Sequence, residues 1–304
     1  MAVLREHHKI LIYWKGEKYL GLDLNWYYDN CKVHMLIMGY VAVALTIFRH
    51  KHPRNPQDQP YPYMDPKYGT KSKYAEATYE SPPLSKEHKK IIQEATVTLL
   101  QYARAVDPTI IISLGSIVPQ QANPAENMMQ KLKQLLDYTS SHPDSVITYQ
   151  ANEMVLVGHS DASYLSKTKA RSRAGGHFFM SNNTAFSPNN GAVFTIAKII
   201  KAVMSSAAEA ELGALFINCN EAITARQALE EIGHKQTPTP MQTDNKTAHG
   251  VFTNNITSKR LKSMDMRLHW LRCRSTQGQF QNYWRSGYTN LGDYVTKHHA
   301  AIHH

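Results

Sequence analysis

Four acidic residues are spaced along the second half of this chain, and together they could support metal-dependent chemistry. Asp161 lies in GHSDASY after a β-rich run, Glu211 in SSAAEAEL, Asp244 in MQTDN and Asp293 in NLGDYVTK. A carboxylate that loses its water in a folded core is costly unless it is paired or binds a cation. Carboxylates are the hard oxygen ligands that Mg²⁺ takes, and two such ions about 4 Å apart are suited to phosphodiester hydrolysis. The four acids therefore predict a two-metal site, provided that the fold brings them together.

Each acid also has a plainer explanation when it is taken alone. Asp161 could occupy a turn, and Asp244 could cap the helix expected over residues 246–251. Asp293 falls in the first turn of a helix expected over residues 290–298, where the helix dipole favours an acid. Metal binding is favoured because four such positions occur in a compatible strand, helix, strand, helix order.

The segment SSAAEAEL contains two glutamates that need different roles. Ser206 followed three residues later by Glu209 forms a capping box, which gives Glu209 an ordinary place at the start of a helix. Glu211 lies instead on the face of that helix that is expected to pack against a sheet, so metal binding would explain its presence there. The same face carries Ala208, Leu212, Leu215 and Cys219.

The elements that must position these acids follow one another in a recognisable order. Beyond Pro143 the apolar residues recur with the spacing of strands and helices in turn. Three strands, helices, a strand, a helix, a strand and a helix are typical of an α/β protein with a mixed sheet and helices on its faces. β-rich stretches span residues 145–149, 154–157, 174–181, 191–200, 241–243 and 279–284, and helical stretches span residues 207–219, 221–232, 259–274 and 290–298.

The first half of the chain is organised differently. Apolar stretches over residues 10–14, 19–24 and 33–36 indicate strands before a helix that ends near His50. Residues 51–83 carry seven prolines, a density that excludes a regular helix and indicates an extended connector. Helical spacing then returns in two stretches. One begins at the cap Ser85 and carries Ile91, Ile92, Ala95, Leu99 and Tyr102, and the other spans residues 124–138 with Met128, Leu132, Leu135 and Leu136.

Composition narrows the class of protein. A net charge of +10 and a pI near 9.3 favour an anionic partner such as nucleic acid. Residues 151–304 hold 17 Lys and Arg against 10 Asp and Glu, whereas residues 1–150 hold 17 against 14.

Three scattered cysteines are too few for a disulfide framework or a Cys-rich zinc site. The apolar run over residues 35–48 is shorter than the roughly 20 residues of a membrane span, and no signal peptide is recognisable.

Longer motifs surround the four acids: SDASYLSKTKARSRAGGHFFMS, MSSAAEAELGALF, TDNKTAHG, KRLKSMDMRLHWLRCR and NLGDYVTKHH. Together they resemble the ribonuclease H domain of copia-type LTR retrotransposon polyproteins. The stretches KGEKYLGLDLNW, GYVAVALTIFRH and LLQYARAVDPT resemble the sequence that joins the reverse transcriptase to that domain. The resemblance therefore covers nearly the whole chain.

The resemblance implies a ribonuclease H-like α/β fold, with a mixed five-stranded sheet and flanking helices, preceded by a smaller α+β connection region. Residues 1–50 would be a remnant of the reverse transcriptase palm and thumb. Residues 51–150 would form a Pro-rich linker and helical connection region, and residues 151–304 the nuclease domain. The family's polymerase motif, Tyr-x-Asp-Asp, has its nearest match in Tyr27–Asn30, which lacks the second Asp. No polymerase activity is therefore expected from this chain alone.

The family's catalytic, metal-binding acids fall on motifs that match Asp161, Glu211, Asp244 and Asp293. The implied activity is endonucleolytic hydrolysis of the RNA strand of RNA–DNA hybrids, with two Mg²⁺ ions, for which Mn²⁺ can substitute. The implied partners are the hybrid and the polymerase domain of the reverse transcriptase, without a membrane. The implied location is intracellular, in a cytoplasmic retroelement particle with access to the nucleus.

Contacts with the nucleic acid can be assigned to residues beside the acids. Ser163 and Asn245 could meet sugar hydroxyls, since each lies next to or near a proposed metal ligand. Basic residues in two clusters could meet phosphates, although a single lysine more often lies on a solvated face. These residues are Lys167, Lys169, Arg171 and Arg173 in a hairpin, and Lys259, Arg260, Lys262 and Arg267 on a helix.

Two alternatives to the nuclease remain open on the sequence. The chain could be a catalytically silent retroelement remnant that binds nucleic acid or a polymerase, because the fold and the basic surface can persist without turnover. It could also be a transposase or integrase, which use acid clusters on similar sheets. The usual three-acid pattern of those enzymes makes them a poorer match to the four acids here.

Overall fold

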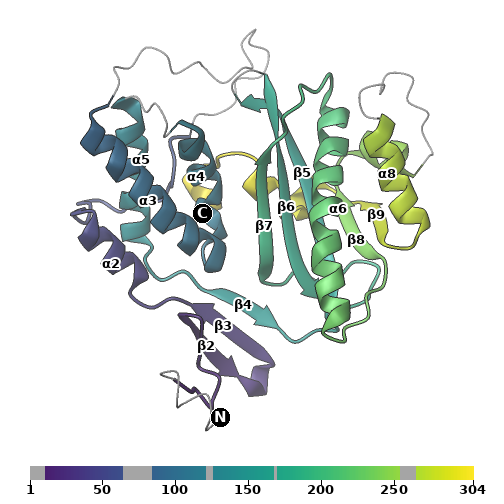
Figure 1. Ribbon diagram of the computed structural model, residues 1–304, viewed down its shortest axis with the longest axis horizontal. Coiled ribbons are helices and arrows are strands. Elements are labelled where there is room, and N and C mark those ends of the chain that lie inside the picture. The colour runs from purple at the N-terminus through teal and green to yellow at the C-terminus, as the bar shows by residue number, and fades with distance from the viewer. Residues whose placement is uncertain (1–10, 64–83, 121–125, 168–169, 254–264) are drawn as a thin grey trace, which may run out of the picture.

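The computed structural model describes residues 11–63, 84–120, 126–167, 170–253 and 265–304. Within them lie a larger and a smaller sheet, with helices packed on and beside the larger one (Figure 1). Buried apolar side chains form one cluster between the larger sheet and its helices, and a second cluster among the helices of the first half. The four predicted acids all belong to the larger sheet or to the segments around it.

The larger sheet has the strand order β7 (Ala192–Ile199), β6 (Arg171–Ser181), β5 (Val155–Lys167), β8 (Thr239–Thr243) and β9 (Phe280–Trp284). β5, β6 and β7 pair antiparallel, whereas β8 runs parallel to β5 and β9 parallel to β8. A parallel neighbour needs a crossover connection, which a helix supplies between β7 and β8. The mixed five-stranded sheet with flanking helices confirms the fold class expected from the sequence.

That crossover is a single helix, α6 (Ala207–Glu231), which packs on β5 and β6. The prediction of two helices, over residues 207–219 and 221–232, is wrong because the buried stripe runs through the expected break: Cys219 and Ala222 are both fully buried. The predicted cap is confirmed, since the Ser206 hydroxyl accepts the backbone N–H of Glu209 at 3.2 Å. Two shorter helices follow, α7 (Lys246–Phe252) and α8 (Asp265–Thr276); the expected helical residues 259–264 lie outside the described part of the chain.

The end of the chain forms short 3-10 turns and not the helix expected over residues 290–298. One such turn spans Asp293–Val295. The Asn290 side chain donates to the carbonyl oxygen of Ser160 at 2.8 Å and accepts the backbone N–H of Gly292 at 3.0 Å. Side chains that bond the backbone in this way compete with a helix, so these contacts tie the segment to β5 instead.

The smaller sheet joins parts of the chain that are far apart in sequence. β1 (Lys18–Tyr19), β2 (Leu22–Tyr27) and β3 (Lys32–Leu36) form an antiparallel meander, and β4 (Ile147–Gln150) pairs with β3. Residues 11–14, which were expected in a strand, lie outside this sheet. The pairing of β4 with β3 closes the intervening helical region into a loop whose two ends meet.

Four helices form the second core: α2 (Tyr40–Ile47), α3 (Lys86–Ala105), α4 (Ile111–Ile117) and α5 (Glu126–Ser141). α3 and α5 match the two helices expected from the apolar spacing, and the Ser85 side chain caps α3 by accepting a backbone N–H at 3.2 Å. Their shared core includes Ile92, Leu99, Ile110, Leu114, Ile117, Met128, Leu132 and Leu135.

No helix in the described ranges is long and apolar enough to cross a membrane. The apolar run over residues 35–48 forms the end of β3 and the helix α2. Val41 and Ala44 of α2 are buried in the second core, which gives this run a packing role.

His177 provides a test of burial in the centre of the larger sheet. It lies on β6 between His159 of β5 and Thr195 of β7, and burial lowers its pKa to about 4. An unfolded histidine titrates near its ordinary value of 6.5. Between these two pKa values the unfolded chain binds a proton that the folded sheet excludes. We expect this residue to lower the free energy of unfolding by about 1.4 kcal/mol for each pH unit of acidification below 6.5.

Urea denaturation of the wild type and of His177→Gln, at neutral pH and again at about pH 5, measures this contribution. The buried acids of the sheet titrate in both proteins, so their effects cancel in the difference between them. We expect acidification to destabilise the wild type more than the variant. The same pH dependence in both proteins would show that His177 does not resist protonation.

Candidate metal centre

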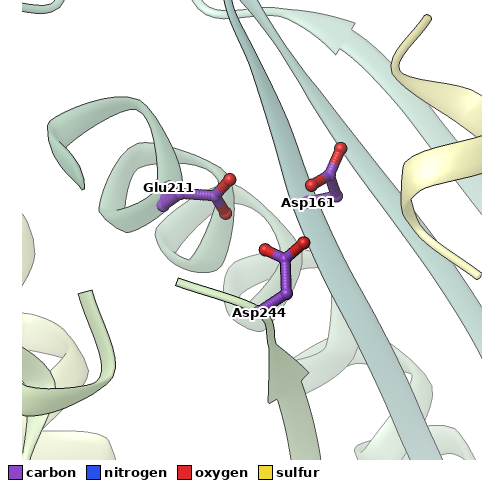
Figure 2. Close-up of side chains that lie close together, drawn as sticks. All are labelled: Asp161, Glu211 and Asp244. Carbon is purple, nitrogen blue, oxygen red and sulfur yellow. The ribbon is translucent and has the colours of Figure 1, made fainter. Parts of the chain in front are cut away.

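Three of the four predicted acids meet at one edge of the larger sheet. Asp161 lies on β5, Glu211 in the first turns of α6, and Asp244 directly after β8. Each offers a carboxylate oxygen that lies within 4.8 Å of the other two, and Figure 2 shows the three side chains pointing toward one another. Strand register explains part of this: Gly158 pairs with Met241, so the positions three residues further along each parallel strand lie level.

Burial and nearby negative charges raise the pKa values of the three carboxylates. Burial raises the pKa of Asp161 to about 6, and the charges of Asp293 and Asp244 act in the same direction. Burial, followed by the charges of Asp161 and Asp244, raises the pKa of Glu211 well above its ordinary value. Burial and the charge of Asp293 also raise the pKa of Asp244. The ionised forms of all three carboxylates are therefore costly in the metal-free protein, although the charge of Lys297 acts in the opposite direction.

A divalent cation fits this cluster on the evidence of its hydrogen bonds. One carboxylate oxygen of Glu211 accepts the backbone N–H of Ala162 at 3.2 Å. The other, Oε2, is buried and has no hydrogen-bond partner among the described residues. This buried oxygen accepts no hydrogen bond from them and lies beside two further carboxylates. Together these oxygens form a set of ligands that a hard cation would satisfy.

Asp293 does not join the three-acid cluster. Its Oδ1 forms an ion pair with Nζ of Lys297 at 2.5 Å, four residues further along the chain. Its charge still raises the pKa values of Asp161 and Asp244, so the carboxylate acts on the cluster from nearby. A role for Asp293 as a fourth metal ligand stays a prediction.

Thr296 holds Asp161 in place. Its hydroxyl donates to Oδ2 of Asp161 at 2.5 Å, across 135 residues of sequence. The carbonyl oxygen of Thr296 in turn accepts the Ser163 hydroxyl at 3.0 Å. Thr296 could not be predicted as a site residue, because a threonine in the motif YVTK carries no local sign that it will contact a distant carboxylate.

Two glycines permit the C-terminal segment to approach β5. A Cβ at Gly175 would lie 2.3 Å from the Thr296 methyl carbon and 2.5 Å from the carbonyl oxygen of Gly292. A Cβ at Gly292 would lie 2.9 Å from the carbonyl oxygen of His159 and 3.1 Å from the backbone nitrogen of Asp161. Neither position has room for a side chain, so the contact between Thr296 and Asp161 depends on both glycines.

Asp244 is not the cap of the helix that follows it. The Asn245 side chain takes that place by accepting the backbone N–H of Ala248 at 2.9 Å. Trp284 of β9 donates its indole N–H to the carbonyl oxygen of Asp244 at 2.8 Å, which fixes the backbone there. The Asp244 carboxylate thus stays available to the cluster, whereas the Asn245 side-chain oxygen already has a structural partner.

Several residues predicted to contact nucleic acid have partners inside the protein. Arg173 is fully buried and donates to the carbonyl oxygens of Ile112 and Gly115, so it does not fit the expected phosphate contact. Ser163 is buried and bonded to Thr296, so it does not fit a contact with a sugar hydroxyl. Lys167 is partly buried, Arg171 begins β6 and Arg267 lies on α8; Lys169, Lys259, Arg260 and Lys262 lie outside the described residues.

Solved structures similar to this chain are ribonuclease H proteins and a reverse transcriptase. The ribonuclease H domain from Mycobacterium tuberculosis aligns with a TM-score of 0.33 and 13% identity, over 47% of this chain and 91% of its own. Ribonuclease H1 of Halobacterium salinarum aligns with a TM-score of 0.28 and 15% identity, over 45% and 89%. Prototype foamy virus protease–reverse transcriptase aligns with a TM-score of 0.28 and 17% identity, over 47% and 19%.

A relative is also found by sequence. The retrovirus-related Pol polyprotein from a Nicotiana tabacum transposon is 26% identical to this chain over 184 residues. The match spans 60% of this chain and 13% of that polyprotein. It confirms the resemblance to a retrotransposon polyprotein that the motifs indicated. No protein-family model matches the chain.

Proposed function

We propose that this chain is a metal-dependent endonuclease of the ribonuclease H type, which hydrolyses the RNA strand of RNA–DNA hybrids during retrotransposon replication. The meeting of Asp161, Glu211 and Asp244 at one sheet edge is the observation that carries the proposal. These residues come from three separate elements, yet their oxygens converge, and one buried oxygen has no donor among the described residues.

The chemistry follows from what the residues can hold. Asp161, Glu211 and Asp244 would bind two Mg²⁺ ions, or Mn²⁺ in their place, with Asp293 as the further ligand predicted from the sequence. When bound, such ions supply polarisation of the attacking water and positive charge at the leaving 3′ oxygen. The protein keeps the ligands oriented: Thr296 donates to Asp161, and the backbone of Ala162 donates to Glu211. The expected products carry a 3′ hydroxyl and a 5′ phosphate.

The rest of the chain is assigned on the same basis. We propose residues 151–304 as the nuclease domain and residues 51–150 as the linker and connection region. Residues 1–50 are proposed as a remnant of the polymerase palm and thumb, and the polymerase domain as a partner. The proposed location is the cytoplasmic retroelement particle, with access to the nucleus.

Incubation with labelled RNA–DNA hybrid, duplex DNA and duplex RNA tests the proposal. With Mg²⁺ or Mn²⁺ we expect cleavage of the RNA strand of the hybrid alone, and none in EDTA. Preferred cleavage of duplex DNA would indicate integrase-like chemistry. Binding of the hybrid without cleavage under every metal condition would indicate the catalytically silent remnant.

A further inference from the structure

Several basic side chains lie close together beside α4 and α5, linked by ring contacts and hydrogen bonds. The Lys131 ammonium lies 5.5 Å from the centre of the Tyr61 ring, and Tyr61 stacks on His298 at 4.0 Å between ring centres. Nε2 of His298 lies 3.1 Å from the Ser116 hydroxyl oxygen, which also accepts the Lys167 ammonium at 3.2 Å. Burial, then the charges of Lys167 and Arg173, hold the pKa of His298 far below its ordinary value, so its ring adds no charge. We call Lys131, Lys167 and the buried Arg173, together with the neutral His298, the basic cluster.

Arg173 adds a buried positive charge behind these side chains. Its guanidinium donates to two carbonyl oxygens within α4, those of Ile112 at 3.3 Å and Gly115 at 3.1 Å. Its Nε is buried and has no hydrogen-bond partner among the described residues. Burial, then the charges of Arg173 and Lys131, lower the pKa of Lys167 to about 7. The cations of the cluster thus lie close enough to repel one another.

No carboxylate neutralises this charge in the part of the chain that the structure describes. None of the ion pairs found there includes Lys131, Lys167 or Arg173. Positive charges held together and away from water are costly unless an anion offsets them. Lysine is a common ligand of phosphate, with which it forms charge-assisted hydrogen bonds. The cluster has the composition of a phosphate site.

The cluster lies close to the proposed metal centre along the C-terminal segment. Thr296 contacts Asp161, and His298 is two residues further on, a span of at most about 7 Å of extended chain. Successive nucleotides of one DNA strand rise by about 3.4 Å. A strand that enters the metal centre would therefore pass the basic cluster within a few nucleotides, with one phosphate per nucleotide to offer.

We propose that the basic cluster binds a backbone phosphate of the nucleic-acid substrate, a few nucleotides away from the cleavage site. Lys131 and Lys167 are its ligands, and Ser116, His298 and Arg173 hold Lys167 and its surroundings in place. The inference rests on the proposed function for the position of the phosphate relative to the cut. Because Lys131 lies on α5 and Lys167 on β5, the proposal also predicts that the connection region and the nuclease sheet both contact the substrate.

Inorganic phosphate is the first probe. Thermal unfolding of the full chain is followed in phosphate and in chloride at equal ionic strength. We expect phosphate to raise the melting temperature of the wild type, and Lys167→Met and Lys131→Met to lose that rise. Lys133→Met, an exposed lysine of the same helix, is the matched control and should keep it. A rise that persists in both cluster variants, or that is absent from the wild type, would overturn the proposal.

The salt dependence of hybrid binding distinguishes a backbone phosphate from free phosphate. Fluorescence anisotropy of a labelled hybrid, read without turnover, gives the slope of log affinity against log salt concentration. Removal of one phosphate contact should reduce that slope by about 1 in Lys167→Met and in Lys131→Met, and leave it unchanged in Lys133→Met. An unchanged slope in the cluster variants would mean that the site takes free phosphate only, and the proposal would be rejected.

The two proposals fail separately. A chain that binds the hybrid through this cluster but does not cut it would retain the phosphate site and lose the nuclease assignment. A chain that cuts the hybrid with slopes unchanged by either variant would retain the nuclease assignment and lose the phosphate site. Lys167→Arg, which keeps the charge, should restore both the phosphate response and the slope.

Discussion

Replacement of Asp161 with Asn should reduce hybrid cleavage by a factor on the order of 10³ or more, because the variant loses a charged ligand at the centre of the three-acid cluster. The same change should stabilise the metal-free protein by about 1 to 3 kcal/mol, since it removes one of several buried charges that repel each other. Loss of activity with a gain in stability is the signature of a site that holds uncompensated charge. Cleavage rates and urea denaturation in EDTA measure the two effects.

Glu231→Gln is the matched control for Asp161→Asn, since Glu231 is an exposed acid at the far end of α6. It should leave both the cleavage rate and the stability near those of the wild type. Added Mg²⁺ should raise the melting temperature of the wild type and of the control, and raise it much less in Asp161→Asn. Full cleavage by the Asp161 variant would contradict the proposed metal centre.

Replacement of Gly175 with Ala should damage both the fold and the site. The added methyl group would meet the Thr296 methyl carbon and the Gly292 carbonyl oxygen at distances that real Cβ atoms do not adopt. Overpacking of this kind costs about 1 to 3 kcal/mol. The C-terminal segment must move, and with it the hydroxyl that holds Asp161, so we expect cleavage to fall by about 10²-fold, the effect of a displacement near 1 Å. Chemical denaturation and cleavage kinetics give the two values.

Gly115→Ala is the matched control for that substitution. A Cβ at Gly115 would find its nearest neighbour, the Arg173 guanidinium, at 3.5 Å, which is ordinary contact. Because Gly115 lies within α4, alanine should also favour the helix by up to about 1 kcal/mol. Equal losses of activity in the two alanine variants would show that Gly175 has no special part in the site.

The acids could be found from sequence because each leaves a local sign. Asp161 and Asp244 follow β-forming runs, and Glu211 interrupts an otherwise apolar helical stripe. Asp161 lies on a central strand and Asp244 directly after its parallel neighbour, an arrangement that can bring the two acids level, so their convergence could be predicted from the sequence. Asp293 was predicted from its local sequence in the same way, yet in the structure it forms an ion pair with Lys297. A lysine four residues further along competes with a metal ion for this carboxylate, and the sequence spacing alone does not decide between the two.

The features that escaped prediction depend on contacts between distant residues. Thr296 contacts Asp161 across 135 residues of sequence, and Arg173 donates to carbonyl oxygens within α4, a helix of the other half of the chain. A basic residue in a strand is expected to face solvent, so its complete burial could not be inferred from its neighbours in sequence. The prediction of a C-terminal helix was wrong for the same reason. The hydrogen bond from Asn290 to Ser160 is a tertiary contact, which the local sequence does not indicate.

The pairing of β4 with β3 has a consequence for how this protein can be truncated. A fragment that starts at residue 151 would discard β4, which packs so closely against Gly191, beside β7, that a Cβ added there would lie 2.6 Å from the Thr148 carbonyl oxygen. It would also discard α4 and leave the Arg173 guanidinium without its two acceptors, at a cost of a few kcal/mol. A minimal active fragment should therefore begin upstream of α4, and the boundary suggested by the motifs alone would cut away part of the support that the nuclease sheet needs.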